Sequence, residues 1–472
     1  MLAPRVALLV FALSAVACGT RRDPDFCCST EESCAATGTE VGLTACTDPA
    51  APVCDDDGVL GAARPRTCIP DIGGTCSVQP DCTTAERPYC VDNRCVQCKV
   101  GDAANDCTGT TPTCSPTTNL CVACGGAADC IGEPGGAVCD PGTGACVECN
   151  DAADCTDPSR PVCEAHACRG CALDDECASL VCDRDSGACA PADQVLYVDG
   201  AAAPGNTACT RAAPCATITA AIAAAAGGDR TIRVAAGTYA GALAVTAGHL
   251  TIHGAGYQTT TITSAAAATV AVTGATVDLE DVTVTGQLNT TVGVTCTANG
   301  ALRLRRAWIR DNTGGGVSVN ACGFDAVNTV ITSNGGTGSS FGGALITALT
   351  TAHPVRFEFN TVAFNTSGSL IKGVSCSAVP VGGVRIRSSV VWSELGAGAV
   401  GSECVVERSI VSAAVTGTDN IVTASPGLTA ITGRPMAGSA AIDHGDPAST
   451  VTADIDGVAR GAAPDSGAYE LP

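Results

Sequence analysis

Short alternations of apolar and polar residues recur through the second half of the chain. The segments that share this pattern are VDLEDVTVTG (277–286), LRLRRAWIRDN (302–312), FDAVNTVITSN (324–334), VRFEFNTVAFN (355–365), VRIRSSVVWSE (384–394) and VVERSIV (405–411). In this shared pattern, two alternating apolar residues lead into a bend, and a second short strand ends in Asn or Gly. Short strands that repeat about every 21–32 residues predict a solenoid whose coils stack in parallel.

The alternation also predicts which side chains face the interior of the solenoid. Because successive side chains of a strand point to opposite faces, Leu302 and Leu304 are expected in the core and Arg303 and Arg305 outside it. Asn328 and Asn360 stand at comparable bends, where their side chains are expected to hydrogen-bond from coil to coil as part of an asparagine ladder.

One segment of this half is helical in character. ATITAAIAAAAGG (216–228) is short and almost wholly apolar, and it follows a first expected strand at 196–200. The open end of a solenoid exposes unpaired strand edges and core side chains, so we expect the helix near 217–226 to cover that end. The prediction for residues 195–472 is therefore an all-β parallel β-helix with an N-terminal helical cap.

Residues 27–194 follow a different pattern, which is set by cysteine. The whole chain has 33 cysteines, and those of this segment include five quartets, at 76/82/90/95, 98/107/114/121, 124/130/139/146, 149/155/163/168 and 171/177/182/189. An acidic residue precedes the second cysteine of every quartet, and Cys27–Cys68 hold a looser sixth unit. Modules of about 25 residues bury too little apolar surface to fold unaided, so they need covalent or metal staples.

Disulfides and zinc are the two alternatives for these staples. The C-x-x-C steps between quartets are typical of zinc sites, but cysteines this numerous are typical of exported proteins, in which disulfides form. We therefore expect a mostly irregular, disulfide-stapled region, without a prediction of its connectivity and without a metal. The repeated acidic residue could bind calcium or accept backbone hydrogen bonds in a turn, and the second alternative is favoured.

Six cysteines remain in the second half. Their order along the chain suggests the pairs Cys209–Cys215, Cys296–Cys322 and Cys376–Cys404. The last two pairs are separated by about one coil, so each is expected to clip adjacent coils together.

The N-terminus indicates export. Residues 1–17 combine an early Arg5 with an apolar stretch and small residues, as signal peptides do. Ala15-Val16-Ala17-Cys18 resembles the lipobox of bacterial lipoproteins, which implies that Cys18 is lipidated and becomes the mature N-terminus. Gly19 follows rather than Asp, and this resemblance implies an outer-membrane, lipid-anchored protein, exposed at the cell surface. The expected organisation is a signal peptide (1–17), an anchor and linker (18–26), cysteine-rich repeats (27–194) and a β-helix (195–472).

The net charge of −22 limits the partners of the chain. Nucleic-acid binding needs clustered Lys and Arg, and a chain with 47 acidic and 25 basic residues argues against it. Lys99 and Lys372 are the only lysines, so the chain has no polybasic membrane patch. Most of the negative charge precedes residue 195, which supports a domain boundary near residue 194.

Two longer segments resemble a known superfamily. LYVDG (196–200) together with PCATITAAIAAAAGGDRTIRVAAGTY (214–239) is similar to the opening of right-handed parallel β-helix proteins of the pectin-lyase-like superfamily. SAAIDHGDPASTVTADIDGVARGAAPDSGAYE (439–470) is similar to the C-terminus of bacterial surface proteins called choice-of-anchor Q. The resemblance implies a right-handed parallel β-helix on an exported protein. The superfamily contains polysaccharide lyases and hydrolases, and also members without catalysis.

A candidate ligand face follows from the register of the coils. Asp278 and Glu280 occupy one coil, Arg303 and Arg305 occupy the next, and Asp325 follows on the third. These residues would form either a carbohydrate groove or a ladder of alternating charges that stabilises coil pairing, and the ladder is favoured. We assign no catalytic residue and no cofactor, with calcium left as an open alternative there and at Asp454-Ile-Asp456-Gly457.

The sequence favours a non-catalytic function. We expect a cell-surface lipoprotein that displays a β-helix for adhesion or for binding extracellular polysaccharide. Trp308 and Trp392 are expected at positions that could face outward and stack on sugars, and Trp308 could equally pack under a loop. The alternatives are a polysaccharide lyase or glycoside hydrolase that acts on acidic glycans at the 278–325 face, and a purely structural envelope protein.

Overall fold

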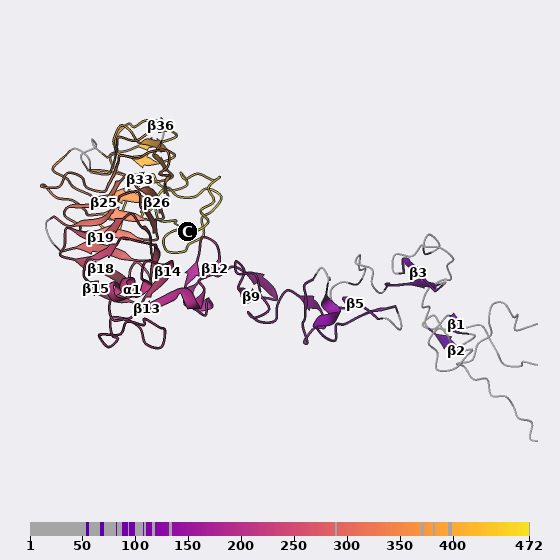
Figure 1. The fold of residues 1–472 in the computed structure, drawn as a ribbon. Coiled ribbons are helices and arrows are strands. Elements are labelled where there is room, and N and C mark those ends of the chain that lie inside the picture. Colours follow the sequence, from indigo (N-terminus) through magenta and orange to yellow (C-terminus); the bar gives the residue numbers. More distant parts are fainter. Residues whose placement is uncertain are drawn as a thin grey trace, which may run out of the picture. The chain divides into compact units, whose positions relative to one another are not determined.

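The structure is a computed structural model of the 472-residue chain. It describes short stretches between residues 53 and 131, and the chain from 135 to 471 apart from 288–289, 370–371, 381–382 and 395–398. The predicted signal peptide and linker, with Cys18, lie outside the described residues. The chain divides into two compact units, Met1–Gly170 and Cys171–Pro472, which are described separately (Figure 1).

The first unit is a series of small antiparallel hairpins. The hairpin of β1 and β2 places Cys54 opposite Cys68 of the looser unit. Each later hairpin carries the third and fourth cysteines of one quartet, so that Cys114 lies opposite Cys121, and Cys139 opposite Cys146. The strands are β1 (Val53–Asp55), β2 (Thr67–Ile69), β3 (Tyr89–Val91), β4 (Arg94–Val96), β5 (Thr113–Cys114), β6 (Cys121–Val122), β7 (Val138–Cys139), β8 (Cys146–Val147), β9 (Val162–Glu164) and β10 (Ala167–Arg169), with the short helix η2 (Ala127–Cys130).

The disulfides of the quartets follow one rule. Where both bonds are described, the first cysteine joins the third and the second joins the fourth. The bonds are Cys98–Cys114 with Cys107–Cys121, Cys124–Cys139 with Cys130–Cys146, Cys149–Cys163 with Cys155–Cys168, and Cys171–Cys182 with Cys177–Cys189. These cysteines are therefore joined as disulfides, as predicted, and their thiolates are not free for zinc.

The repeated acidic residue closes a turn in each of three quartets. The carboxylate of Asp129 accepts the backbone N–H of Gly125 at 2.7 Å, that of Asp154 accepts Asn150 at 2.8 Å, and Glu176 accepts Ala172 at 2.7 Å. The carboxylate thus binds the backbone four residues earlier and fixes the loop between the first and second cysteines, which is the favoured of the two expected roles.

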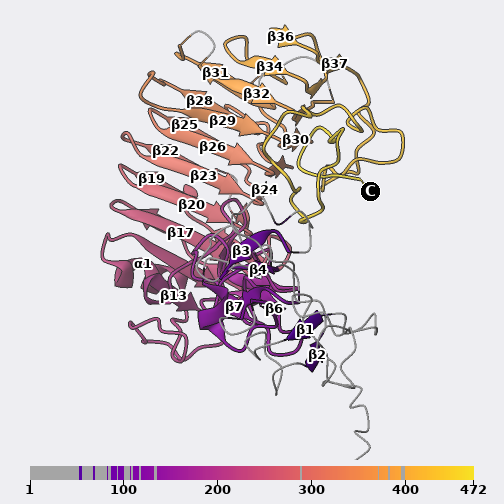
Figure 2. The ribbon, with the colours of Figure 1, turned by 90° about the vertical axis from the view of Figure 1, so that its right-hand side faces the viewer.

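The second unit is a parallel β-helix built from three sheets (Figures 1 and 2). The ten-stranded sheet contains β13 (Val195–Val198), β14 (Arg230–Val234), β17 (His249–Gly254), β20 (Thr276–Glu280), β23 (Ala301–Arg305), β26 (Gly323–Val327), β29 (Val355–Glu358), β32 (Arg385–Arg387), β34 (Val405–Glu407) and β36 (Gly417–Thr418). Each strand pairs in parallel with the corresponding strand of the next coil, so the predicted all-β parallel fold is confirmed.

The other two sheets complete the coils. The nine-stranded sheet contains β15 (Gly237–Ala240), β18 (Thr260–Ser264), β21 (Thr283–Gly286), β24 (Trp308–Arg310), β27 (Val330–Thr332), β30 (Thr361–Ala363), β33 (Val390–Val391), β35 (Ile410–Val411) and β37 (Ile421–Val422). The six-stranded sheet contains β16 (Leu243–Val245), β19 (Ala268–Thr273), β22 (Val292–Thr297), β25 (Gly315–Asn320), β28 (Ala344–Thr347) and β31 (Val374–Ser377).

Helix α1 (Ile218–Ala225) covers the first coil, as expected. The side chain of Thr217 accepts the backbone N–H of Ala220 at 3.2 Å and so caps the start of the helix. Ile218 and Ala221 are buried in the same apolar core as Val198 and Ile232 of the first strands. In Figure 1, α1 lies beside β13 at one end of the solenoid, and β36 lies at the other.

The core alternation holds with one exception. Leu302 and Leu304 are fully buried and Arg303 is 38% exposed, as predicted. Arg305 points away from the apolar core, yet it is only 2% exposed, so the expectation that it lies outside in solvent is wrong. The residues from Cys171 to Gln194 cover it. They form a module, here called the docked module, with β11 (Cys182–Asp183), β12 (Ala188–Cys189) and the short helices η3 (Asp174–Glu176) and η4 (Ala192–Gln194).

The bends between the sheets contain residues with left-handed backbone conformation in successive coils. At the bend after the ten-stranded sheet, the residues with φ between 46° and 53° are Asp281, Arg306, Asn328, Phe359, Ser388 and Arg408. The bend after the nine-stranded sheet holds the asparagine ladder of Asn312, Asn334 and Asn365, in which Asn334 Oδ1 accepts the Asn312 Nδ2 at 2.9 Å.

The predicted pairing of Asn328 with Asn360 is wrong. Asn360 Oδ1 accepts the backbone N–H of Thr329 at 2.9 Å, one residue beyond the expected partner. Asn328 occupies the left-handed position of its bend and donates instead to the backbone carbonyl of Ala453 at 2.8 Å.

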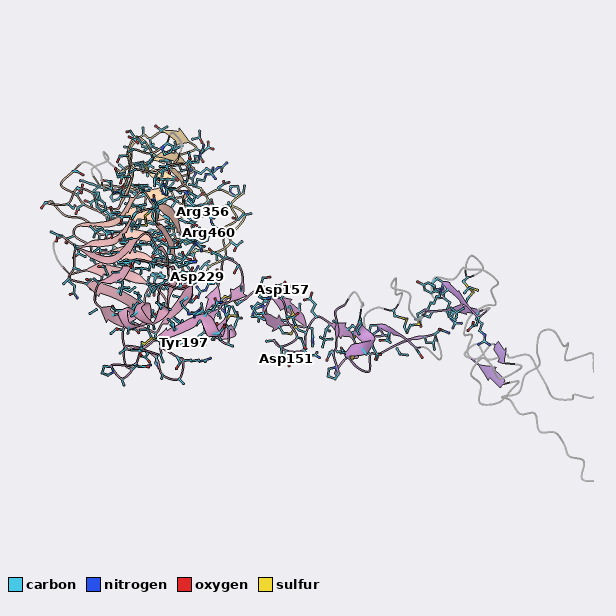
Figure 3. The ribbon with its side chains drawn as sticks, viewed as in Figure 1. Asp151, Asp157, Tyr197, Asp229, Arg356 and Arg460 are labelled. Carbon is cyan, nitrogen blue, oxygen red and sulfur yellow. A yellow bond between two sulfur atoms is a disulfide. The ribbon has the colours of Figure 1, made fainter. Side chains whose placement is uncertain are left out.

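Residues 424–471, here called the strap, run back along the solenoid (Figure 2). The Gly467 N–H of the strap donates to the Ser388 carbonyl at 2.7 Å, and the Ala468 N–H donates to Thr361 Oγ1 at 3.0 Å. Asp456 of the strap accepts a hydrogen bond from the Tyr257 hydroxyl at 2.6 Å. The strap therefore fastens late coils to the early coil of β17 and β18. Arg460, labelled in Figure 3, anchors it by stacking 4.0 Å from the ring centre of Phe359.

Three disulfides stabilise the β-helix of the second unit, in addition to the two of the docked module. The three bonds of the β-helix join Cys209 to Cys215, Cys296 to Cys322 and Cys376 to Cys404, the pairs that their order in the sequence suggests. Cys296 lies on β22, and Cys322 follows the neighbouring strand β25, so this bond clips adjacent coils. In the part of the chain that the structure describes, no helix has the length and apolar character needed to cross a membrane.

Candidate functional site

The predicted ligand face lies on the outward side of the ten-stranded sheet. Asp278, Arg303 and Asp325 are register partners on β20, β23 and β26. Arg303 Nη1 lies 3.1 Å from Asp278 Oδ2, and Arg303 Nε lies 3.8 Å from Asp325 Oδ2. The charges thus alternate from coil to coil and pair, which is the ladder that the sequence favoured.

The docked module covers the part of this face that includes Glu280 and Arg305. Asp185 Oδ2 lies 2.9 Å from Arg305 Nε, and Arg184 Nη1 lies 3.7 Å from Asp281 Oδ1. Arg305 also pairs with Asp325, at 2.5 Å. Arg305 and Asp281 therefore hold the module onto the sheet, and Glu280 is linked to it only through His253. The alternative of a carbohydrate groove does not hold at Glu280 and Arg305, because both are buried.

A buried histidine sits at the centre of this contact. His253 is fully buried, and its ring nitrogens lie 2.9 Å from Asp174 of the docked module and 3.1 Å from Glu280. Burial lowers the pKa of His253, but the hydrogen bonds to Asp174 and Glu280 outweigh it and raise this pKa to about 9. Arg233 Nη2, at 3.1 Å from Asp174, adds a second cation to the same carboxylate.

Ionisation of the module's carboxylates is favoured at this contact. Burial alone would raise the pKa of Asp174 and of Asp185, but the bond to His253 lowers the first and the bond to Arg305 lowers the second. Asp278 differs, because burial raises its pKa despite the nearby Arg303. The charged groups are thus arranged to hold the module in place while its carboxylates are ionised.

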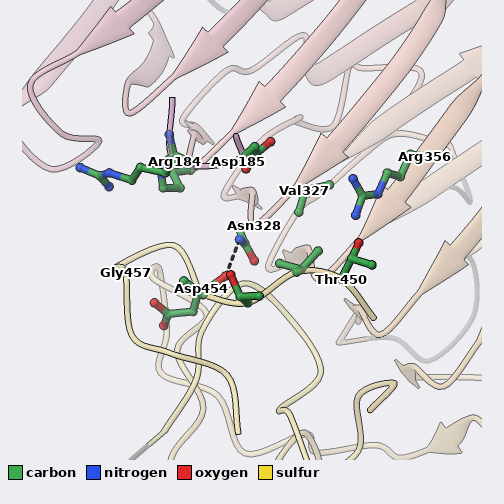
Figure 4. A pocket seen from close by; sticks show the side chains of 12 residues that line it. Arg184, Asp185, Val327, Asn328, Arg356, Thr450, Asp454 and Gly457 are labelled. Atoms are coloured by element: carbon green, nitrogen blue, oxygen red, sulfur yellow. Dashed lines mark hydrogen bonds between the residues drawn. The ribbon is translucent and has the colours of Figure 1, made fainter. Parts of the chain in front are cut away.

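Beyond the module, the same sheet carries a series of hollows among the described residues. The first has a volume of about 170 Å³ and is lined by Arg184, Asp185, Asn328, Arg356 and the strap residues 450–454 (Figure 4). The second, of about 290 Å³, shares Arg356 with the first, and the third, of about 160 Å³, shares Arg387 with the second. We call this continuous run, with Arg356, Arg385, Arg387 and Arg408, the arginine groove.

The alternation of charge breaks down in one outward row of the groove, whereas in the neighbouring row Glu358, Arg387 and Glu407 are register partners and continue it. Arg356 is the register partner of Asp325 and continues the ladder, but β32 then presents Arg385 and Arg387 with no acidic residue between them. Because Phe357 pairs with Ile386, the residues before them, Arg356 and Arg385, stand side by side on the outward face. The groove thus holds adjacent cations in a chain whose net charge is −22.

On β29, β32 and β34 three arginines meet only two carboxylates, those of Glu358 and Glu407. Arg408 has its own partner in Asp419, and Asp446 also lines the third hollow. Glu407 alone pairs with both Arg385 and Arg387, which are each 49% exposed, and Glu358 pairs with Arg356 at 2.9 Å. Glu358 also accepts a hydrogen bond from Ser449 of the strap at 2.7 Å. A guanidinium that shares its carboxylate keeps donors free, so the groove can accept the carboxylates of a ligand.

The tryptophans lie away from this groove. Trp308 is half-buried on the nine-stranded sheet, and its Nε1 donates to Thr332 Oγ1 at 2.9 Å. Trp392 packs against Phe364 with a ring-centre distance of 5.4 Å, in a cluster with strap residues Leu428 and Ala441. The outward, sugar-stacking position expected for Trp392 is therefore wrong, because the strap packs against this side chain.

The segment Asp454–Gly457 forms a hydrogen-bonded turn. Asp454 Oδ1 accepts the backbone N–H groups of Asp456 and Val458, both at 2.8 Å, and Oδ2 accepts that of Glu470 at 2.8 Å. Burial raises the pKa of this carboxyl group, and the backbone bonds oppose the shift. The Asp454 oxygens thus bind the strap itself, as the hydrogen-bonded alternative predicts.

Sequence reasoning missed the arginines of the groove. It selected three earlier coils of this face as the candidate ligand face, whereas Arg356, Arg385 and Arg387 belong to later coils of the same sheet. The available signal was the loss of acidic residues from the alternation in VRIRSSVV (384–391), where two outward arginines flank one apolar residue.

Comparisons with known proteins give structural likeness only. No protein-family model matches the chain, and no curated protein matches it. Among solved structures, pectate lyase Pel9A is 13% identical with a TM-score of 0.31, covering 59% of this chain and 96% of its own. Pectin methylesterase PemA from Erwinia chrysanthemi is 12% identical with a TM-score of 0.27, covering 51% and 92%. The pectin methylesterase from Aspergillus niger is 17% identical with a TM-score of 0.31, covering 50% and 87%.

Proposed function

We propose that this chain binds an acidic extracellular polysaccharide along the arginine groove and holds it without cleaving it. The observation that carries the proposal is the local surplus of arginine on β29 and β32, where Arg385 and Arg387 share a single glutamate. Long-range repulsion from a net charge of −22 disfavours anionic ligands in general, so a cationic stripe on such a chain points to a specific anionic partner.

The geometry of the groove suits a polymer with regularly spaced carboxylates. Neighbouring strands of a sheet lie about 4.8 Å apart, so cations on successive coils repeat along a line. Guanidinium groups match carboxylates with two parallel hydrogen bonds and are more weakly hydrated than ammonium groups. Several such contacts, each modest, would retain a long chain that bears uronate units.

We favour binding over cleavage because the groove carboxylates of Glu358 and Glu407 are already engaged in ion pairs. Glu358 and Glu407 are both held in ion pairs with arginines, and Glu358 is also bonded to Ser449. A carboxylate that acts as a general base needs room for the substrate proton at its oxygen. We also propose that a lipid on Cys18 anchors the protein in the outer membrane, from which the β-helix is displayed.

The test is retention of the mature full-length chain on immobilised polygalacturonate, with dextran as the neutral matrix. We expect Arg385→Ala/Arg387→Ala to weaken binding at least tenfold, because each charge-assisted hydrogen bond contributes about 1.5–3 kcal/mol. A higher salt concentration should also weaken the binding of the wild-type chain to polygalacturonate. The control is Arg160→Ala/Arg230→Ala, which removes the same charge from exposed positions outside the groove.

Three outcomes would contradict the proposal. Equal retention of the groove variant and the control would exclude the arginine groove as the binding surface. Equal retention on dextran would exclude an acidic ligand. New polysaccharide chain ends that disappear in the groove variant would favour the alternative of a lyase or hydrolase.

A further inference from the structure

A second concave site lies on the nine-stranded sheet, away from the arginine groove. Its volume is about 340 Å³, and strands β18, β21 and β24 form it together with the strap. Three aromatic rings line it, those of Tyr257, Trp308 and Tyr469, and the rings of Tyr257 and Trp308 meet edge to face at 6.3 Å. We call it the aromatic pocket.

Planar polar groups surround these rings. The guanidinium of Arg310 lies 4.6 Å from the centre of the Trp308 ring, and that of Arg434 lies 4.4 Å from the centre of the Tyr469 ring. The Tyr257 hydroxyl donates to Asp456 Oδ1 at 2.6 Å and accepts from Gln258 Nε2 at 2.9 Å. Burial, together with the bond to Asp456, raises the pKa of Tyr257 to about 12, so this hydroxyl remains protonated.

The charges of the aromatic pocket balance, in contrast to those of the arginine groove. Arg310 pairs with Asp311 at 2.6 Å, and Arg434 pairs with Asp456. Each arginine thus has its own carboxylate, whereas two arginines of the groove share Glu407. A pocket without surplus charge gives no preference for an anionic ligand and favours a neutral one.

We propose that the aromatic pocket binds a neutral sugar unit. A pyranose presents an apolar C–H face, which packs on aromatic rings, and a rim of hydroxyls, which bond to planar Arg, Asp and Gln side chains. Tyr257 and Tyr469 are 6% and 2% exposed, so the half-buried Trp308 offers most of the ring surface that a ligand can reach. The volume lies near the lower end of the roughly 300–1,000 Å³ range of ligand sites, which suits one or two sugar units.

The strap completes the pocket. Arg434 and Tyr469 belong to the strap, whereas the other two aromatic residues, Tyr257 and Trp308, belong to the coils. The proposal is independent of the proposed function, since the two sites lie on different sheets and differ in charge. One chain would thus hold an acidic polymer at one surface and a neutral sugar at another.

The experiment uses the full chain and the intrinsic fluorescence of tryptophan. Trp308 and Trp392 are the only tryptophans, so Trp392→Phe leaves Trp308 as the reporter. The probes are cello-, malto-, manno- and xylo-oligosaccharides, with oligogalacturonate as the acidic comparison. We expect at least one neutral oligosaccharide to change the Trp308 emission at millimolar concentration, with an affinity at least tenfold above that of oligogalacturonate.

Two variants in the Trp392→Phe background distinguish the pocket from other surfaces. Thr261→Tyr places a ring into the pocket from β18 without removing a buried side chain, and we expect at least tenfold weaker binding. Thr297→Tyr, the same change on the six-stranded sheet, should bind like the parent. Retention on polygalacturonate should be unchanged in both.

The proposal is overturned if no neutral oligosaccharide binds, if Thr261→Tyr binds as well as Thr297→Tyr, or if oligogalacturonate binds the pocket most tightly. Loss of polygalacturonate retention in Arg385→Ala/Arg387→Ala, with Trp308 titration intact, would establish that the two sites act separately.

Discussion

Asn334 stabilises the stacking of three coils through one amide group. It is fully buried, its Oδ1 accepts the backbone N–H of Asn312 at 3.2 Å, and its Nδ2 donates to the Ile309 carbonyl at 2.8 Å and to Asn365 at 3.1 Å. An amide both donates and accepts, so one residue type can satisfy the backbone at a bend and extend the row of hydrogen bonds to the next coil.

Removal of this amide should destabilise the solenoid. Asn334→Ala leaves the Asn312 N–H and the Ile309 carbonyl buried without that partner, and each unsatisfied group costs about 1–3 kcal/mol. We expect the free energy of unfolding in urea to fall by about 2 kcal/mol or more. Asn320→Ala, at an exposed position on β25, should change it by no more than about 0.5 kcal/mol. Equal stability of the two variants would contradict the role of the ladder.

The bends show where sequence reasoning fails at the level of single residues. Arg306 and Phe359 adopt φ of 50° and 52°, a conformation that favours Gly and Asn. Neither residue signals such a bend in the sequence. The stack imposes it, because Phe359 donates its N–H to the Arg387 carbonyl of the next coil at 3.1 Å. Asn328 and Asn360 were predicted as ladder residues. The partner of Asn360 is Thr329 rather than Asn328, a one-residue difference in register that only the packed coils determine.

At the scale of elements, the docked module is the part of the molecule whose role the sequence least reveals. Its four cysteines have the spacing of the other quartets, yet it belongs to the compact unit of the β-helix. Its contacts depend on Asp174, Arg184 and Asp185, which in the sequence look like ordinary exposed charged residues. Their role is evident only from their partners on β17, directly after β20 and on β23. The predicted boundary near residue 194 was based on the change in charge composition there. Composition carries no information about contacts between segments that are distant in the sequence.

The buried histidine makes this docking depend on pH. The folded pKa of His253 is about 9 and its ordinary value is 6.5, so its stabilising contribution is complete below about pH 6.5 and is lost as pH rises through about 9. The groups that face it are Asp174, Glu280 and Asp281, with Arg233 beside Asp174. The lowered pKa values of Asp174 and Glu280 act in the opposite range, because their contribution is lost only as acid protonates them.

Thermal unfolding should therefore show a midpoint that falls by several °C between pH 7 and pH 9.5. The same series for His253→Gln, which cannot titrate, should be flat in this window. His353→Gln, a change at a half-buried histidine outside this contact, should keep the slope of the wild type. A wild-type midpoint that stays constant or rises would contradict the assignment of His253 as a protonated, paired group.

At the scale of the whole molecule, the sequence predicted the order of its parts well. The cysteine repeats and the stacked parallel coils follow from spacing and alternation, because each is a local pattern repeated many times, and the helical cap follows from one short apolar segment. The third sheet of the solenoid was not predicted. The arginine groove and the aromatic pocket do not follow from such local patterns. Both need the strap, whose contacts with coils over a hundred residues away, such as Asn328 with Ala453, have no periodic signal in the chain.

Limited trypsin digestion under mild reduction should locate the edge of the second unit. The disulfides of the first unit hold small modules with little apolar core, so their reduction should open them to protease. We expect cleavage after Arg169 and protection of Arg184, whose guanidinium contacts Asp281. The stable product should then begin at Gly170.

A stable product that begins at Asp185 would place the docked module outside the unit and contradict this expectation. Asp174→Ala/Asp185→Ala removes the module's carboxylate contacts to His253 and Arg305, and it should make Arg184 cleavable while the coils remain protected.

The strap has a consequence for how this protein can vary in length. Stacked coils are usually easy to add or delete, since each contacts only its neighbours. Here a single segment reaches from the late coils to Tyr257, with Asp456, Ala453 and Gly467 matched to separate coils. Inserting one coil would shift these partners by about 4.8 Å, more than a hydrogen bond tolerates. The strap therefore acts as a ruler, and homologues that keep it are expected to keep the number of coils between β17 and β34.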